Sequence, residues 1–128
     1  MIVAGIGCRK GATEHEVLAA THAALSTHCL ASTRLSALAT IQLKAQETGI
    51  IAAARTLAKP LLIANDDAIA AVDAKLLTRS EASLSAAGTP SVSEASALAI
   101  AGKNSRLLGP RHVEGDVTCA IAVSGDEP

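Results

Sequence analysis

The sequence contains no phenylalanine, tyrosine or tryptophan, and this absence limits both its core and its partners. Proteins that bind single-stranded nucleic acid or RNA stack bases on aromatic rings, and this chain has none. Its net charge of −1 also lacks the basic excess of nucleic-acid-binding proteins. We therefore predict no nucleic-acid partner. A core without bulky side chains depends on close approach of its elements, which favours added burial in a homo-oligomer.

Long apolar runs and paired cysteines are also missing. No stretch reaches the roughly 18–20 uninterrupted apolar residues that span a bilayer, and no cationic segment precedes the first apolar run, as a signal peptide requires. Three widely separated cysteines indicate reduced thiols. We predict a cytoplasmic protein without a membrane partner. The length of 128 residues predicts one domain over residues 1–128, with residues 124–128 as a frayed tail.

The spacing of histidines and cysteines argues against a metal site. His15, His22 and Cys29 recur every seven residues along one predicted helix face. Seven helical residues rise about 10.5 Å, which is too far for two of these side chains to share an ion. The chain has no C-x-x-C or H-x-x-x-H pair. We expect no metal and no cofactor.

Short apolar segments alternate with helical segments along the chain. The predicted strands cover residues 2–7, part of 35–43, 61–64, 106–108 and 117–123. The predicted helices run from about 13 to 28, 47 to 58, 65 to 72 and 91 to 101, with a loop and one helical turn over 75–88. This alternation predicts an α/β fold, a three-layer α/β/α sandwich. Its mixed, mostly parallel sheet should have about five strands and a C-terminal antiparallel hairpin.

Two of the predicted helices begin with the pattern of a capping box. Thr13 is followed by Glu16, and Ser91 is followed by Glu94. In a capping box the hydroxyl and the carboxylate each accept a hydrogen bond from an otherwise unpaired backbone N–H group. Both pairs are therefore expected to fix a helix start.

The glycine-rich stretch Gly5-Ile-Gly-Cys-Arg-Lys-Gly11 follows the first predicted strand and precedes a helix. A dinucleotide-binding loop needs G-x-G-x-x-G, but Lys10 occupies the third glycine position and Gly11 comes one residue late. A P-loop needs Gly-Lys-Ser/Thr, and Gly11-Ala-Thr13 lacks the lysine. What remains is a turn whose amides and cations, Arg9 and Lys10, either bind an anion or are only solvated.

Cys8 lies within this turn and is a candidate nucleophile. Two neighbouring cations and a helix N-terminus should lower the pKa of its thiol. A cysteine nucleophile also needs a base, and sequence spacing places no histidine beside Cys8. A small, buried cysteine at the end of a strand is the alternative interpretation, and the residues favour it.

Five motifs in order resemble one family. They are Gly5-Ile-Gly-Cys-Arg-Lys-Gly11, Ala39-Thr-Ile-Gln-Leu-Lys44 followed by Glu47, Leu57-Ala-Lys-Pro-Leu61, Pro90-Ser-Val-Ser-Glu-Ala95 and Val117-Thr-Cys-Ala-Ile-Ala122. Over residues 2–123 the chain resembles the CobE family of cobalamin biosynthesis. That family is similar to the C-terminal domain of the cobalt-precorrin-5A hydrolase CbiG.

The resemblance implies binding of a precorrin or related polycarboxylate tetrapyrrole, and contact with other enzymes of the cobalamin pathway. The alternatives are a lactone hydrolase of the precorrin-5A type, with Cys8 or Glu47 as catalytic candidates, and an accessory protein without its own ligand. Gln42 stands where the family commonly has Asp, which favours binding over catalysis. The expected ligand-binding residues are Gly5, Gly7, Cys8, Arg9, Lys10, Gly11, Thr13, Lys44, Glu47, Ser91 and Glu94. Further candidate cations are Lys103, Arg106 and Arg111.

Overall fold

The first strand, β1 (Ile2–Cys8), lies at the centre of the sheet in a computed structural model that describes residues 1–125. The sheet order is β3-β2-β1-β6-β4, and β5 also pairs with β6. The other strands are β2 (Ala37–Ile41), β3 (Leu61–Ala64), β4 (Arg106–Leu107), β5 (His112–Glu114) and β6 (Val117–Val123). Strands β1, β2 and β3 are parallel, whereas β6 is antiparallel to β1, β4 and β5. The mixed sheet is confirmed, and β5 brings it to six strands.

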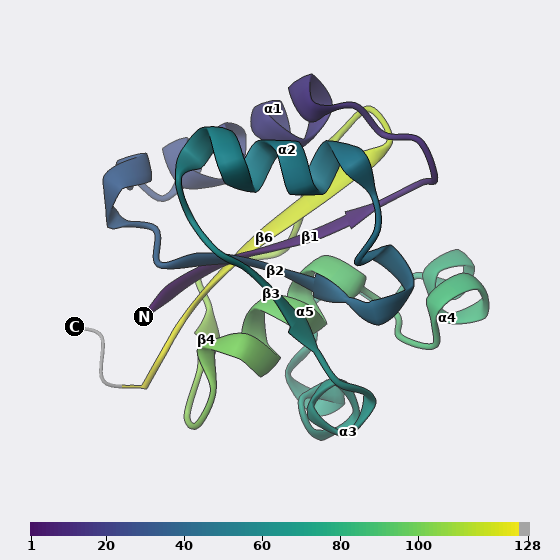
Figure 1. Cartoon of the computed structure of the whole chain (residues 1–128). Coiled ribbons are helices and arrows are strands. Elements are labelled where there is room, and N and C mark those ends of the chain that lie inside the picture. Colours follow the sequence, from purple (N-terminus) through teal and green to yellow (C-terminus); the bar gives the residue numbers. More distant parts are fainter. Residues whose placement is uncertain (126–128) are drawn as a thin grey trace.

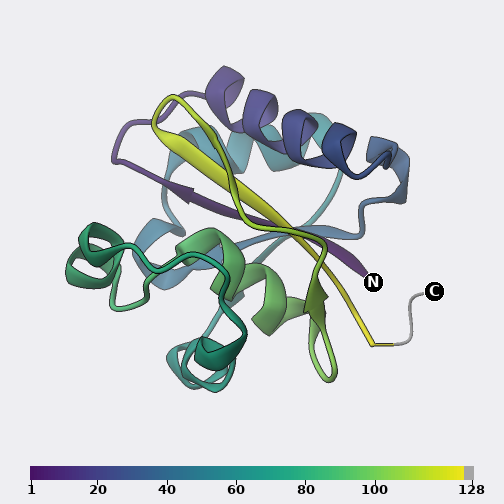
Figure 2. The same cartoon turned by 180° about the vertical axis from the view of Figure 1, so that it is seen from behind.

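Helices cover both faces of this sheet, as the predicted three-layer sandwich requires (Figures 1 and 2). Helices α1 (Glu14–Thr27) and α2 (Thr48–Leu57) lie on one face. Helix α5 (Val92–Ala101) packs on β1, β2 and β6 from the other face, and α3 (Asp66–Ala71) lies beside it. A separate apolar cluster fills the space on each side of the sheet. Because both faces are covered, β1 and β6 are buried almost throughout, which explains their continuous apolar sequences.

The start of α1 confirms its predicted capping box. The Thr13 hydroxyl accepts a hydrogen bond from the Glu16 amide, and the Glu16 carboxylate accepts one from the Thr13 amide. At α5 only half of the box forms. The Ser91 hydroxyl accepts from the Glu94 amide at 3.4 Å, but the Glu94 carboxylate bonds elsewhere. The second capping box was therefore wrong in its reciprocal half, because loop amides compete for the carboxylate.

The segment predicted as a loop with one helical turn contains a longer helix, α4 (Glu81–Ala87). The Ser80 hydroxyl caps its first turn by accepting from the Ser83 amide, and Gly88 ends it with a φ of +78°. A Ser cap and a left-handed glycine are the ordinary signals of a helix start and end. Apolar periodicity did not predict this helix because α4 buries none of its side chains. Short 3₁₀ turns precede and follow β2 at η1 (Ser32–Arg34) and η2 (Gln42–Lys44), and a third, η3 (Asp73–Lys75), follows α3.

The two ends of the described chain lie together at one edge of the molecule. The N-terminal amine of Met1 donates to the Ser124 hydroxyl at 2.7 Å, and Ser124 is buried. The rest of the predicted frayed tail, residues 126–128, lies outside the described residues. Among residues 1–125, no helix is both long enough and apolar enough to cross a membrane.

Candidate functional site

A cavity of about 410 Å³ opens where β1 ends, at the carboxyl side of the parallel strands. Open α/β sheets bind ligands at this edge because the loops that follow the strands diverge there. The end of β1 forms the floor of this cavity with the first residue of α5. Helix α4, the η2 turn and the β5–β6 hairpin form its walls. In Figures 1 and 2, α4 stands out from the body of the molecule at this end of β1.

Basic side chains from three separate segments converge on the cavity. Among the described residues that line it, Arg9, Lys44 and Arg111 are basic and Asp116 is the acidic member. Arg9 follows β1 and approaches the Asp116 carboxylate at 3.8 Å, but its side chain is 86% exposed and remains available to an anion. Lys44 ends η2, and Arg111 precedes β5. The side chains of the lining thus carry a net positive charge.

The rest of the lining is mostly apolar or small. Leu43 and Val113 both line the cavity, and each remains 61% exposed despite its apolar side chain. Val92 lies on the floor, and Ala82 and Ala86 come from α4. Such exposed apolar side chains beside cations suit a ligand with an apolar body and anionic edges.

Cys8 lines the cavity but lacks the properties of an activated nucleophile. Burial raises the pKa of its thiol, the nearby Glu47 carboxylate raises it further, and Lys44 offsets only part of this effect. The lowered pKa expected from its sequence neighbours was wrong, because Arg9 pairs with Asp116 and Lys10 is exposed to solvent. At neutral pH this thiol is therefore protonated and weakly nucleophilic.

The predicted loop residues divide between the cavity and the outer surface. Gly7, Cys8, Arg9 and Lys44 line the cavity, but Lys10, Gly11, Thr13 and Glu47 do not. The Gly11 amide donates to Glu47 Oε1 at 2.9 Å, which ties the turn to the start of α2. Thr13 belongs to the α1 cap. Glu47, the second catalytic candidate, is thus placed in a structural hydrogen bond beside the cavity.

Three further predicted ligand-binding residues lie beneath the cavity, inside the protein. A Cβ atom on Gly5 would come within 1.9 Å of the Ser93 carbonyl oxygen, so this glycine admits α5 rather than a ligand. Ser91 and Glu94 are both fully buried, with 0% exposure. None of the three lines the cavity.

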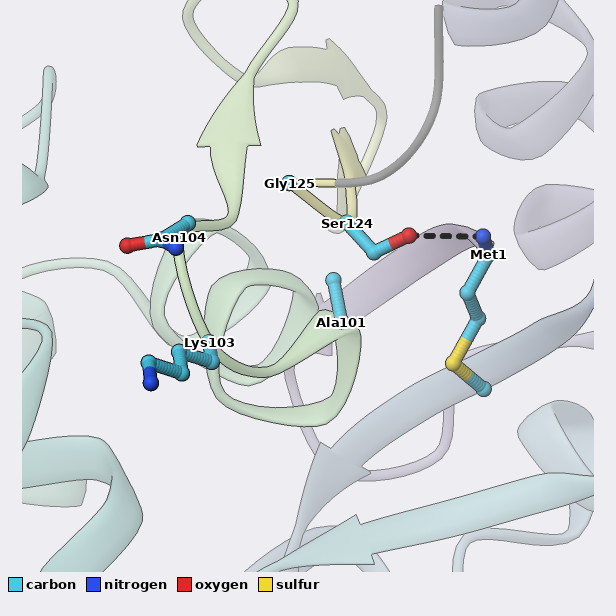
Figure 3. Close-up of a pocket in the computed structure, with 6 residues that line it drawn as sticks. All are labelled: Met1, Ala101, Lys103, Asn104, Ser124 and Gly125. Carbon is cyan, nitrogen blue, oxygen red and sulfur yellow. Dashed lines mark hydrogen bonds between the residues drawn. The ribbon is translucent and has the colours of Figure 1, made fainter.

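A second cavity, of about 530 Å³, lies at the opposite end of the sheet. Figure 3 shows its lining, in which Met1 and Ser124 are hydrogen-bonded and the Lys103 and Asn104 side chains extend away from them. Lys103 and the N-terminal amine of Met1 are the basic groups among its described lining residues. We take the cavity at the end of β1 as the candidate functional site because three basic side chains and the strand ends converge there. Among residues 1–125, no group of three His, Cys, Asp or Glu side chains could hold a metal ion.

Several lining residues were not among the sequence-predicted site residues. Thr118, Asp116 and Val113 belong to the β5–β6 hairpin, and Arg111 was only a further candidate cation. The antiparallel register pairs Cys8 with Val117, which brings the hairpin beside the end of β1. The predicted hairpin paired residues 106–108 with 117–123 and treated 109–116 as the turn, so it missed β5. The position of the β5–β6 hairpin next to β1 depends on the strand order. For the α4 wall, the available signals were the Ser80 cap and Gly88 at the two ends of the helix.

Comparisons with known proteins agree on one family. Residues 2–122 match the family model described as Cobalamin synthesis G C-terminus. Protein CobE from Sinorhizobium sp. is 30% identical over 121 residues, covering 94% of this chain and 79% of that protein. A crystal structure of CobE from the cobalamin (vitamin B12) biosynthetic pathway superposes with a TM-score of 0.90 at 32% identity, covering 95% of this chain and 89% of that one.

A second solved structure is more similar in sequence. The cobalamin biosynthesis protein chiG from Agrobacterium tumefaciens is 48% identical, with a TM-score of 0.78 and coverage of 98% of this chain and 100% of that one. The resemblance found in the motifs is therefore confirmed across almost the whole chain. The chain belongs to the Cobalamin synthesis G C-terminus family of cobalamin-biosynthesis proteins.

Proposed function

We propose that this protein binds a precorrin, or a closely related polycarboxylate tetrapyrrole of cobalamin biosynthesis, in the cavity at the end of β1. The observation that carries the proposal is the convergence of Arg9, Lys44 and Arg111 on a partly apolar cavity. A precorrin has an apolar macrocycle and many peripheral carboxylates. Arginine can pair with a carboxylate through two parallel hydrogen bonds, and apolar side chains can pack against the ring.

Binding is better supported than lactone hydrolysis. The two catalytic candidates are a thiol with a raised pKa and a carboxylate engaged with the Gly11 amide. Gln42, where the resembled family commonly carries Asp, is exposed and does not line the cavity. Under this proposal the protein works in the cytoplasm, holds an intermediate and passes it to other enzymes of the pathway.

Titration with porphyrins tests the proposal. The chain has no aromatic residue, so protein absorbance in the near ultraviolet does not interfere with the ligand bands. We expect uroporphyrin, which is rich in carboxylates, to bind and shift its visible absorbance. Mesoporphyrin, which carries fewer carboxylates, should bind more weakly. Absence of a spectral shift and of co-elution on a sizing column would refute the proposal.

Paired variants test the role of the cations. Arg111→Gln should weaken uroporphyrin binding about ten- to a hundredfold, because a charge-assisted hydrogen bond is worth about 1.5–3 kcal/mol. Arg9→Ala should weaken it less, since this side chain is largely exposed. Lys10→Ala removes a neighbouring charge that does not line the cavity and is the matched control. Equal affinities in all three variants would show that the basic side chains of the cavity are merely solvated.

A further inference from the structure

Glu94 is a fully buried carboxylate, with 0% exposure, in the first turn of α5. Within residues 1–125, no basic side chain forms an ion pair with it. Its oxygens accept four hydrogen bonds instead. Oε1 accepts the backbone N–H groups of Leu77 and Thr78, each at 2.8 Å. Oε2 accepts the Thr78 hydroxyl at 2.6 Å and the backbone N–H of Arg111 at 3.0 Å.

These donors come from two loops, one leading into the α4 wall and one carrying Arg111. Thr78 lies two residues before Ser80, the cap of α4, so its position sets where the α4 wall begins. Arg111 contributes one of the basic side chains of the cavity. Glu94 itself lies on α5, whose first residue, Val92, is on the floor. One buried carboxylate therefore connects α5 to the segment that leads into α4 and to the loop that carries Arg111.

The α4 wall depends on such connections because it has little packing of its own. None of its side chains is buried. Besides the Glu94 contacts, the Ser80 amide donates to the Pro90 carbonyl at 3.0 Å, and the Ser83 hydroxyl donates to the Thr89 carbonyl at 2.7 Å. A helix with few buried contacts belongs to the least stable part of a fold. Its position is thus set mainly by hydrogen bonds at its ends.

We propose that Glu94 is a positioning residue of this cavity: it holds the backbone that carries Arg111 and the start of α4 at the separation that the ligand requires. This inference rests on the proposed function. Glutamine at this position would keep the shape but would turn an N–H₂ group toward backbone N–H donors. The amides of Leu77, Thr78 and Arg111 would then compete for one remaining oxygen.

Binding and amide hydrogen exchange in Glu94→Gln test the proposal. Glu81→Gln is the matched control, since it makes the same chemical change at an exposed position of α4. We expect Glu94→Gln to raise the Kd for uroporphyrin at least about tenfold. We also expect it to accelerate exchange over residues 77–88 and at Arg111, while the control changes neither. In the double variant with Arg111→Gln, Glu94→Gln should raise the Kd for uroporphyrin by a smaller factor than it does alone. The reason is that part of its effect on binding passes through Arg111.

Exchange and porphyrin affinity together distinguish failure of the positioning role from failure of the proposed function. Faster exchange in Glu94→Gln with unchanged porphyrin affinity would overturn the positioning role and leave the proposed function standing. A native protein that binds no porphyrin would refute the proposed function. In that case, if Glu94→Gln also left amide exchange over residues 77–88 unchanged, the claim that Glu94 holds the start of α4 in place would be overturned separately.

Should Glu94→Gln fail to fold, Thr78→Val replaces it. This variant removes only the hydroxyl donor to Oε2, and Thr33→Val, at an exposed threonine, is its control. We expect faster exchange in α4 and a smaller loss of porphyrin affinity than in the cation variant Arg111→Gln. Identical binding and exchange in Thr78→Val and its control would overturn the proposal.

Discussion

Gly5 sets the distance between α5 and the central strand, and Gly5→Ala should therefore destabilise the whole domain. A Cβ atom at this position would lie 1.9 Å from the Ser93 carbonyl oxygen and 2.8 Å from both the Ala97 nitrogen and Ser96 Oγ. The first two of these atoms belong to the helix backbone, so no side-chain rotation can relieve the overlap. Since ordinary contact begins at 3.4 Å, α5 would have to retreat by about 1.5 Å from β1.

The magnitude follows from the packing that such a retreat would lose. Overpacking a well-packed core costs about 1–3 kcal/mol, and a gap of 0.5–1 Å already forfeits a quarter to a half of each dispersion contact. Because backbone atoms must move, we expect the upper end, about 3 kcal/mol. An unfolding entropy of about 2.1 cal/mol/K per residue gives about 270 cal/mol/K for 128 residues. Gly5→Ala should then lower Tm by about 11 °C.

Thermal unfolding followed by far-ultraviolet circular dichroism measures this loss, since a chain without tyrosine or tryptophan has no intrinsic fluorescence. The control is Gly88→Ala, where an added Cβ meets nothing within 4 Å and only the φ of +78° is unfavourable. Left-handed backbone costs a residue other than glycine about 1–2 kcal/mol, so this variant should lose about 4–7 °C. A Gly5→Ala protein as stable as Gly88→Ala would refute the idea that Gly5 sets the helix-to-sheet distance.

Two further predictions concern the α1 cap and the thiols. Thr13→Ala should cost about 1 kcal/mol at neutral pH. The backbone amide and then the hydroxyl of Thr13 lower the pKa of Glu16 by donating to its carboxylate. Thr13→Ala keeps the amide and removes the hydroxyl, whose contribution is present above the usual pKa of Glu16 and is lost as pH falls through the folded value. Thermal unfolding should therefore show a smaller deficit in acid, and a pH-independent deficit would contradict this. Ellman's reagent should modify exposed Cys29 first and Cys8 slowly, because burial raises the Cys8 pKa. Cys119, whose pKa burial raises to about 12, should react only after unfolding. Mass mapping that found Cys8 fastest would restore it as a nucleophile.

Local patterns in the sequence were sufficient for most of the secondary structure. The Thr13 cap, the Ser91 hydroxyl cap and the apolar runs of β1 and β6 involve residues close together in sequence. Each cap forms within one helical turn, so its energetics do not depend on how the rest of the chain folds. The apolar runs predict strands because a parallel sheet is covered on both faces. The α/β class follows from the alternation of elements. The full length of helix α4 was not predicted because it buries no side chain and so shows no apolar periodicity.

The members of the site were decided by tertiary structure. Arg9 and Lys10 are neighbours with the same charge, yet among the two only Arg9 lines the cavity. The backbone and side chain of Arg9 both contact Asp116 of the β5–β6 hairpin, which places Arg9 beside the cavity. Arg111 enters the cavity because β6 runs antiparallel beside β1, an order that no local pattern specifies.

The hydrogen bonds of Glu94 show both a local and a tertiary contribution. By itself, the sequence determined a helix start at Ser91, because a hydroxyl and an amide three residues apart form a local cap. Only the fold decided what the Glu94 carboxylate does. Its partners lie 16 and 17 residues away, on two different loops. Amides from those loops reach it once α5 is buried against the sheet, and a buried carboxylate must accept hydrogen bonds from whichever donors the fold brings within reach.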